Sequence, residues 1–155
     1  MSTPVFVGLD IGSSRTKVAV IDADRQVLGH AVRKSGTDFS ATAETCLDES
    51  LEMAGVRRDE IVNAISTGYG RTNVAFVTAR SKTEIGCLSR WGRHHFSEAI
   101  TIIDIGGQDN KIIKLDASGR RDSFKMNRKC AAGTGAFLEE MSYRLYPRWG
   151  QAARL

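Results

Sequence analysis

Two segments of the chain combine a carboxylate, a glycine turn and a lysine at the same spacing. Each has an apolar run followed by Asp-Ile-Gly, a Lys seven positions after that Asp and a second Asp twelve positions after it. The matched residues are Asp10, Gly12, Lys17 and Asp22 in the first segment, and Asp104, Gly106, Lys111 and Asp116 in the second. A single Asp-x-Gly turn between strands is often only a hairpin. Two in register predict a duplicated unit whose halves face one another.

The chemistry of these two turns is that of phosphate binding. The glycine after Asp-Ile lets the backbone approach a ligand closely, and the turn that follows presents N–H groups to it. The strand-end carboxylates Asp10 and Asp104 are expected to hold a hydrated magnesium ion, which prefers one or two carboxylates plus phosphate. In the first turn, hydroxyl donors for phosphate oxygens come from Ser13, Ser14 and Thr16.

Other side chains of the two turns suit ATP hydrolysis. Lys17 supplies counter-charge for the phosphates, and Gln108 or Asp109 is expected to orient an attacking water molecule. The corresponding ligand-binding residues of the second turn are Gly106, Gly107 and Lys111. The alternative is that both segments are hairpins with helpful caps and bind nothing.

Composition and charge are those of an ordinary globular protein. With 155 residues and 41% hydrophobic content, the chain can bury a real core. Its net charge is +4, but Lys and Arg are scattered, and no basic run carries interleaved aromatic residues. This distribution argues against nucleic-acid binding. The sequence contains neither a signal-peptide pattern nor a long apolar run, so we expect no membrane association and a cytoplasmic location.

The elements that position the first turn form a three-stranded meander followed by a helix. Alternating apolar residues predict strands over residues 5–9, 16–21 and 27–33. Ser40 is expected to cap a helix that runs to about Ala54 and stops at Gly55. The apolar stripe that should cover the sheet consists of Ala43, Leu47, Leu51 and Ala54.

Between the two segments the sequence predicts a strand, a glycine-rich loop and two further elements. A short strand over residues 61–66 delivers the loop 67–71, and another strand is expected over residues 74–77. A helix should follow over residues 83–95, although two glycines weaken its pattern, Gly86 and Gly92.

The second segment repeats the order of the first. Its meander is expected over residues 100–103, 111–115 and 122–126, followed by a helix with an apolar stripe of Phe137, Leu138, Met141 and Leu145. We therefore predict an α/β fold of two lobes. Residues 1–98 form the first lobe, and residues 99–155 form an incomplete second lobe.

Several motifs carry a resemblance to a known family. The segments Asp10-Ile-Gly-Ser-Ser-Arg-Thr-Lys17 and Asp104-Ile-Gly-Gly-Gln-Asp-Asn-Lys111 resemble the two phosphate motifs of the actin, hexokinase and Hsp70-type ATPase superfamily. Together with Thr67-Gly-Tyr-Gly-Arg71 and Met126-Asn-Arg-Lys-Cys-Ala-Ala-Gly-Thr-Gly135, the second segment also resembles the ATP-dependent activators of 2-hydroxyacyl-CoA dehydratases and the ATPase subunits of benzoyl-CoA reductase. The resemblance implies an actin-like (ribonuclease H-like) ATPase fold.

The resemblance also implies cofactors and partners that the spacing does not show. Family members are dimers that hold one [4Fe–4S] cluster between subunits, with two cysteines from each subunit. ATP hydrolysis drives a low-potential electron from this cluster into an acyl-CoA dehydratase or reductase. Reduced ferredoxin or flavodoxin is the implied donor, and the second subunit is a copy or a paralogue. The motif adds three cofactor-binding residues, Gly133, Thr134 and Gly135.

Cys130 matches one of the cluster ligands of this family. It lies just ahead of a predicted helix, with Arg128 and Lys129 beside it, and this setting favours a thiolate. Considered apart from the resemblance, Cys130 can equally be a small buried hydrophobic residue. The second ligand of the family lies further downstream, and neither Cys46 nor Cys87 is positioned to replace it.

The end of the chain departs from the family pattern. Residues 146–155 lose both that pattern and the helical stripe, and Pro147 would interrupt a continuing helix. The adenosine-binding loop of the family would follow this point, so we expect a truncated product and leave open whether it hydrolyses ATP. Two other readings stay open: a small-molecule kinase of the same superfamily with a carboxylate as general base, and a non-catalytic fragment.

Overall fold

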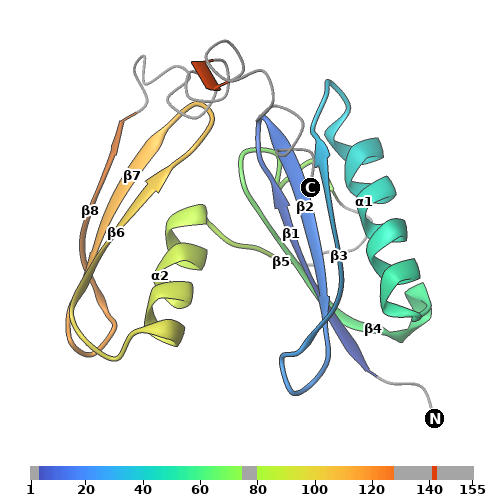
Figure 1. Ribbon diagram of the computed structural model, residues 1–155, viewed down its shortest axis with the longest axis horizontal. Coiled ribbons are helices and arrows are strands. Elements are labelled where there is room, and N and C mark those ends of the chain that lie inside the picture. Colours follow the sequence, from blue (N-terminus) through green and yellow to red (C-terminus); the bar gives the residue numbers. More distant parts are fainter. Residues whose placement is uncertain (1–3, 75–79, 128–140, 143–155) are drawn as a thin grey trace. The chain divides into compact units, whose positions relative to one another are not determined.

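The computed structural model describes residues 4–74, 80–127 and 141–142 (Figure 1). By its contacts the chain divides into two compact units, Met1–Glu84 and Ile85–Leu155, which are described separately below. This division reflects contacts alone and does not test the predicted lobes. The lobes over residues 1–98 and 99–155 therefore remain a prediction. None of the described helices combines the length and the apolar character needed to cross a bilayer.

The first unit contains a five-stranded sheet with the order β3-β2-β1-β4-β5. The central strand β1 pairs antiparallel with β2 and parallel with β4. Its strands are β1 (Val5–Ile11), β2 (Arg15–Ile21), β3 (Val27–Lys34), β4 (Ile61–Thr67) and β5 (Arg80–Ser81). The predicted meander and the strand expected over residues 61–66 are therefore confirmed, with ends that differ by one or two residues.

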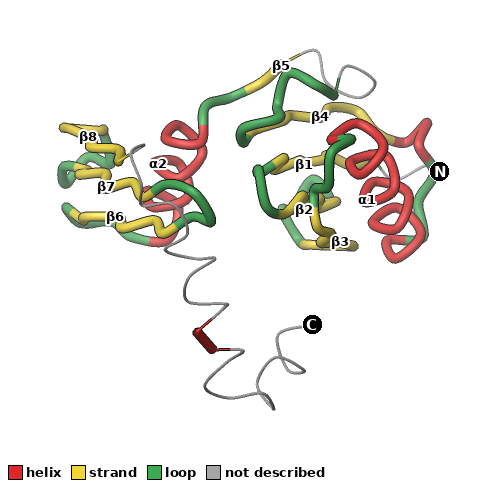
Figure 2. The backbone as a smooth tube through the Cα atoms, turned by 90° about the horizontal axis from the view of Figure 1, so that it is seen from above, coloured by secondary structure: helices red, strands yellow, loops and turns green. Residues whose placement is uncertain are grey.

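Helix α1 (Phe39–Ala54) packs on one face of this sheet (Figure 2). The predicted cap at Ser40 is wrong, because the N-cap is Asp38, whose side chain accepts a hydrogen bond from Ala41 N. An aspartate carboxylate satisfies an otherwise unpaired N–H of the first turn, so the helix begins before Ser40. The predicted stop is confirmed: Gly55 adopts the left-handed conformation with φ of 66°.

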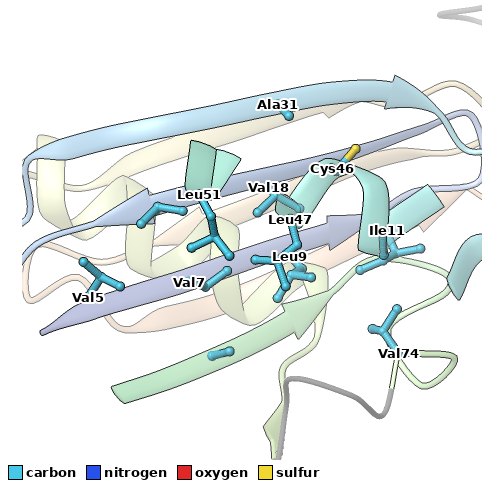
Figure 3. Packing of buried hydrophobic residues seen from close by; sticks show 13 residues of the cluster. Val5, Val7, Leu9, Ile11, Val18, Ala31, Cys46, Leu47, Leu51 and Val74 are labelled. Carbon is cyan, nitrogen blue, oxygen red and sulfur yellow. The ribbon is translucent and has the colours of Figure 1, made fainter. Parts of the chain in front are cut away.

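The core of the first unit lies between α1 and the sheet (Figure 3). Alternate residues of β1 point into it, so that Leu9 and Ile11 are buried while Asp10 belongs to the opposite face. The predicted stripe of α1 supplies the other side of the core, with Ala43, Leu47 and Leu51 buried and Ala54 partly buried. Burial of these side chains holds the strand that carries Asp10.

One glycine sets how closely α1 approaches the sheet. A Cβ atom on Gly29 in β3 would lie only 2.2 Å from Ser50 O and 2.8 Å from Ala54 N of the helix backbone. The helix therefore rests directly on the backbone of β3 at this point.

The segment after β4 differs from the prediction. Of the strand expected over residues 74–77, Val74 is not in a strand, and the rest lies outside the described residues. The structure instead pairs β5 with β4 in parallel, over two residues. A short 3-10 helix, η1 (Arg58–Glu60), precedes β4. The loop at the carboxyl end of β4 begins at Gly68 and lies beside the end of β1, as the hydrogen bond from Gly70 N to Ile11 O indicates.

The second unit contains a three-stranded antiparallel meander with the order β6-β7-β8 and helix α2 on one of its faces (Figure 2). Its elements are α2 (Glu84–His95), β6 (Ile100–Ile105), β7 (Asn110–Leu115) and β8 (Arg121–Asn127). The predicted helix and second meander are confirmed. The helix expected after this meander lies outside the described residues, apart from 141–142.

The two glycines that weaken the helical pattern of α2 lie within the helix, and packing explains Gly92. A Cβ atom there would lie 2.7 Å from Ile102 Cδ1 and 3.0 Å from Leu115 Cδ1. The missing side chain lets α2 lie flat on β6 and β7, where Ile85, Ile102 and Leu115 form the small buried core together with Ile113. Close helix–sheet contact offsets the low helix propensity of glycine.

Candidate functional site

The first predicted turn connects β1 to β2. Asp10 and Lys17 are directly opposite in the strand pair, and Lys17 Nζ donates to Asp10 Oδ2 at 2.8 Å. The Gly12 N–H donates to Arg15 O at 3.1 Å and closes the turn. A Cβ atom on Gly12 would lie 2.8 Å from that same carbonyl oxygen, so only glycine fits. Both charged side chains stay open to solvent, with exposed fractions of 40% for Asp10 and 46% for Lys17.

The second predicted turn connects β6 to β7 in the same way. Asp104 and Lys111 are directly opposite in the strand pair, and Lys111 Nζ donates to Asp104 Oδ2 at 3.2 Å. The same ammonium also donates to Asp109 Oδ1 at 2.7 Å. The Gly106 N–H donates to Asp109 O at 2.8 Å and closes the turn. Here the lysine is buried, with an exposed fraction of only 2%.

The repeat extends to the next turn of each meander. Asp22 Oδ1 accepts from Gln26 N at 2.8 Å, and Asp116 Oδ1 accepts from Arg120 N at 2.9 Å. In both turns the third residue after the aspartate has positive φ, 65° at Arg25 and 71° at Gly119. The spacing found in the sequence therefore corresponds to the same backbone path in each unit.

The hydroxyl groups of the first turn differ in their surroundings. Ser13 is partly exposed and Ser14 exposed, whereas Thr16 is fully buried. Thr16 Oγ1 lies 2.9 Å from Ser35 Oγ, which donates to Gly12 O at 2.6 Å. Thr16 therefore belongs to a buried hydrogen-bond chain beneath the turn, and its predicted contact with phosphate remains a prediction.

Ser35 is a residue of this site that the sequence analysis missed. It follows β3, and its N–H donates to Ser14 O at 3.0 Å, so it joins the end of the third strand to the turn. The meander contained the signal: β2 and β3 pair Arg15 with Lys34, which brings the residue after β3 to Ser14.

In the second turn, Gly107 is partly exposed and Gln108 exposed, while Asp109 is held by Lys111. The amide of Gln108 is therefore the more open of the two side chains predicted to orient water. The remaining predicted residues Cys130, Gly133, Thr134 and Gly135 lie outside the described residues.

The loop after β4 lies against the first turn. Gly68 has φ of 91°, and a Cβ atom there would lie 2.7 Å from Asp10 Oδ1 and 2.4 Å from Ile11 O. The Gly70 N–H donates to Ile11 O at 2.8 Å. Arg71 Nη1 in turn donates to Gly68 O at 3.1 Å. Glycine at position 68 therefore lets the loop backbone reach the Asp10 carboxylate.

The donor set of the first turn fits magnesium. Within the described ranges no group of three or more His, Cys, Asp or Glu side chains could hold a metal ion. Magnesium does not require such a group, because it keeps several water molecules and binds through one or two carboxylates and substrate phosphates. The Asp10 carboxylate, open to solvent and shared with one lysine, suits that mode of binding.

Of the two described cysteines, Cys46 does not suit an iron–sulfur cluster. Cys46 is fully buried in the core of the first unit, and its Sγ lies 3.8 Å from Thr16 O. Burial raises the pKa of the Cys46 thiol, which disfavours the thiolate that binds iron. Cys87 lies partly buried in α2 of the second unit.

The chain is similar to a family of ATPases and to activators of acyl-CoA dehydratases. A family model described as the BadF/BadG/BcrA/BcrD ATPase family matches residues 7–148. The activator of lactoyl-CoA dehydratase from Anaerotignum propionicum is 37% identical over 149 residues, which are 96% of this chain and 57% of that protein. The chain thus spans about half the length of the curated relatives that it matches.

Two solved structures are similar throughout most of this chain. The activator of 2-hydroxyisocaproyl-CoA dehydratase from Clostridium difficile, solved with bound ADPNP, has a TM-score of 0.81 at 37% identity and covers 91% of this chain and 52% of its own. Component A of the Acidaminococcus fermentans (R)-2-hydroxyglutaryl-CoA dehydratase has a TM-score of 0.80 at 30% identity, with coverages of 92% and 54%. The predicted α/β, actin-like ATPase fold is thereby confirmed.

Proposed function

Because the chain belongs to the BadF/BadG/BcrA/BcrD ATPase family, we propose that the protein is an ATP-hydrolysing activator of an acyl-CoA dehydratase or reductase. The observation that carries this proposal is the repeated hairpin, in which Asp10 pairs with Lys17 and Asp104 pairs with Lys111 at equivalent positions. Relatives named as activators of 2-hydroxyacyl-CoA dehydratases favour that class of partner.

The contacts of the two turns support distinct roles in nucleotide binding. Asp10 and Asp104 hold a hydrated magnesium ion, which supplies charge neutralisation for the phosphates of ATP when it is bound. The ammonium of Lys17 is available to a phosphate oxygen because it is half exposed. Its hydrogen bond to Asp10 also lies at the surface. Lys111 holds the carboxylates of Asp104 and Asp109 in place. Gln108 orients the attacking water molecule.

The finer part of the proposal concerns electron transfer. In it, Cys130 contributes to a [4Fe–4S] cluster shared by two subunits, since a two-fold axis doubles each cysteine. Reduced ferredoxin or flavodoxin supplies the electron, and the protein works in the cytoplasm. The sequence setting of Cys130, next to Arg128 and Lys129, supports this role. Iron content per chain tests it: substitution Cys130→Ser should remove the iron, and unchanged iron content would exclude Cys130 as a ligand.

Calorimetric titration with a non-hydrolysable ATP analogue tests nucleotide binding directly. We expect heat of binding that increases with magnesium, and we expect Asp10→Ala to lose the magnesium-dependent part. Asp10 is exposed and its removal leaves an exposed lysine, so the fold should tolerate the change. The matched control is Asp24→Ala, at an exposed acidic residue of the next turn. Absence of binding by the unmodified protein, or equal binding by both variants, would contradict the proposal.

A further inference from the structure

A hydroxyl group on the strand next to Asp10 has no hydrogen-bond partner among the residues that the structure describes. Thr67 is the last residue of β4, and its Oγ1 atom is buried without a partner in the structure. Buried polar atoms are nearly always paired, and an exception calls for a physical explanation. The motif that begins at Thr67 has no role in the function proposed above.

Thr67 lies in a row of three polar side chains across three neighbouring strands. Asp10 of β1 pairs with Lys17 of β2 on one side and with Thr67 of β4 on the other. Residues directly opposite one another in a sheet share a face. This face is opposite to the one that α1 covers, because Leu9 and Val18 point towards α1. Lys17, Asp10 and Thr67 therefore lie side by side on this face of the sheet.

Lys17 and the loop after β4 each approach one carboxylate oxygen of Asp10, and this loop follows Thr67 directly. Asp10 Oδ2 accepts from Lys17, and Oδ1 faces the backbone of Gly68. Ser66 Oγ donates to Arg71 O at 2.9 Å, which closes the loop on itself on the far side of Thr67. The branched threonine side chain also has few rotamers available. Thr67 is thus held opposite Asp10 in the strand pair, and its hydroxyl bonds to none of the described residues.

We propose that Thr67 is a positioning residue whose hydroxyl accepts a hydrogen bond from a water molecule of the divalent cation held at Asp10. The inference rests on the function proposed above. Magnesium keeps several water molecules in protein sites, and those waters need acceptors in the surrounding protein. A threonine hydroxyl has two acceptor lone pairs, and the ligand would supply the partner that the protein does not.

This role predicts opposite effects on binding and on stability. Valine has nearly the shape of threonine, and a methyl group stands in place of the hydroxyl. If that group served the fold, its loss would lower stability. Because Oγ1 has no partner in the described part of the chain, Thr67→Val should leave the thermal midpoint equal or raise it. Cation binding should nevertheless become weaker, as expected when a functional group is kept at a cost in stability.

The test measures binding of Mn²⁺, in place of magnesium, by electron paramagnetic resonance in the presence of a non-hydrolysable ATP analogue. We expect Thr67→Val to raise the apparent Kd for Mn²⁺ about tenfold, the effect of one lost hydrogen bond to a charged group. Thr67→Ser, which keeps the hydroxyl, should stay within about twofold of the unmodified protein. The thermal midpoint of each variant is measured alongside.

Each result bears on one part of the inference. Unchanged Mn²⁺ binding by Thr67→Val, a serine variant that behaves like valine, or weaker binding that accompanies a lower midpoint would overturn it. Equal weakening of analogue binding without metal would also overturn it, since the hydroxyl would then contact phosphate. If the unmodified protein binds no analogue, the proposed function fails too, whereas failure of Thr67→Val alone leaves that function intact.

Discussion

The two Asp–Lys hairpins share a backbone path but differ in what covers them. In the first unit, Asp10 and Lys17 lie on the sheet face away from α1, and Lys17 is half exposed. In the second unit, Asp104 and Lys111 lie on the same face as Ile102 and Ile113, the face that α2 covers, and Lys111 is buried. The same motif therefore leaves one lysine available to a ligand and makes the other a part of the fold.

A single residue in each turn reinforces this difference. The residue five positions after the first aspartate closes both turns through its carbonyl, but it is Arg15 in one hairpin and Asp109 in the other. Asp109 adds a second carboxylate to Lys111, which offsets the cost of burying the ammonium. Arg15 supplies no carboxylate at the corresponding position of the first turn.

The largest expected effect comes from replacing each lysine by methionine. Lys111→Met removes a buried cation and leaves two carboxylates without it, so we expect a loss of about 2–3 kcal/mol in the free energy of unfolding. Lys17→Met breaks only a solvent-exposed pair and should cost less than about 1 kcal/mol. Denaturant unfolding followed by the fluorescence of Trp91, which lies in α2, reports on the second unit.

The first unit needs a separate probe, and hydrogen exchange of the peptides that contain β1 and β2 supplies one. Lys17→Met should leave this exchange nearly unchanged while weakening nucleotide binding. Equal losses of stability from the two substitutions would show that the two hairpins do not differ in the way their burial indicates.

The sequence predicts the similarity of the hairpins better than their difference. Spacing is enough to pair Asp10 with Lys17 and Asp104 with Lys111, because a two-residue period and a tight turn determine the register. The sequence does not indicate which face a neighbouring helix covers, since α2 could pack on either side of the meander that follows it. Gly92 carries part of that information, because its missing side chain marks where α2 rests on the sheet.

The contacts around the first turn were harder to predict for a related reason. Ser35 and Gly68 reach this turn from the ends of β3 and β4, so their contacts depend on strand order and on where each strand ends. A motif search finds the loop after β4, but the approach of Gly68 to Asp10 Oδ1 appears only when the parallel pairing of β1 and β4 is known. Local spacing contains no such information.

An intermediate effect is expected from alanine at the turn glycines. A Cβ atom at Gly12 would lie 2.8 Å from Arg15 O, and one at Gly106 would lie 2.9 Å from Asp109 O. Both substitutions should therefore cost about 1–2 kcal/mol of stability. Gly106→Ala should cost the more, because its Cβ would also lie 2.9 Å from Asp109 Oδ1, which accepts from Lys111.

The double variant Gly106→Ala with Lys111→Met tests this coupling. The double variant should lose less stability than the sum of the two single losses, since both substitutions act on the contact between Asp109 and Lys111. The comparison pair, Gly12→Ala with Lys17→Met, should couple less strongly, because a Cβ atom at Gly12 would make only an ordinary contact of 3.7 Å with Lys17 Nζ. Additive losses in the second hairpin would mean that its glycine acts on the backbone alone.

The smallest effect is expected at the aspartates that close the two meanders, and it depends on pH. Asp116 Oδ1 accepts from Ser118 Oγ at 2.7 Å and from the N–H groups of Ser118 and Arg120, whereas Asp22 Oδ1 accepts only from Gln26 N in the described structure. The Ser118 hydroxyl and then the Arg120 N–H hold the pKa of Asp116 below its ordinary value.

A lowered pKa in the folded state means that the carboxylate stabilises the fold above the ordinary pKa of about 4, and that this contribution is lost as pH falls towards the folded-state pKa. Asp116→Asn should therefore lower the unfolding midpoint of the second unit slightly at pH 7, and the difference from the unmodified protein should shrink as the pH is lowered to about 3. If the difference in unfolding midpoint stays constant with pH, the substitution acts through the turn geometry and not through the lost charge of Asp116. The matched change Asp22→Asn, followed by hydrogen exchange in the first unit, should have a smaller effect at pH 7, because fewer donors hold that carboxylate.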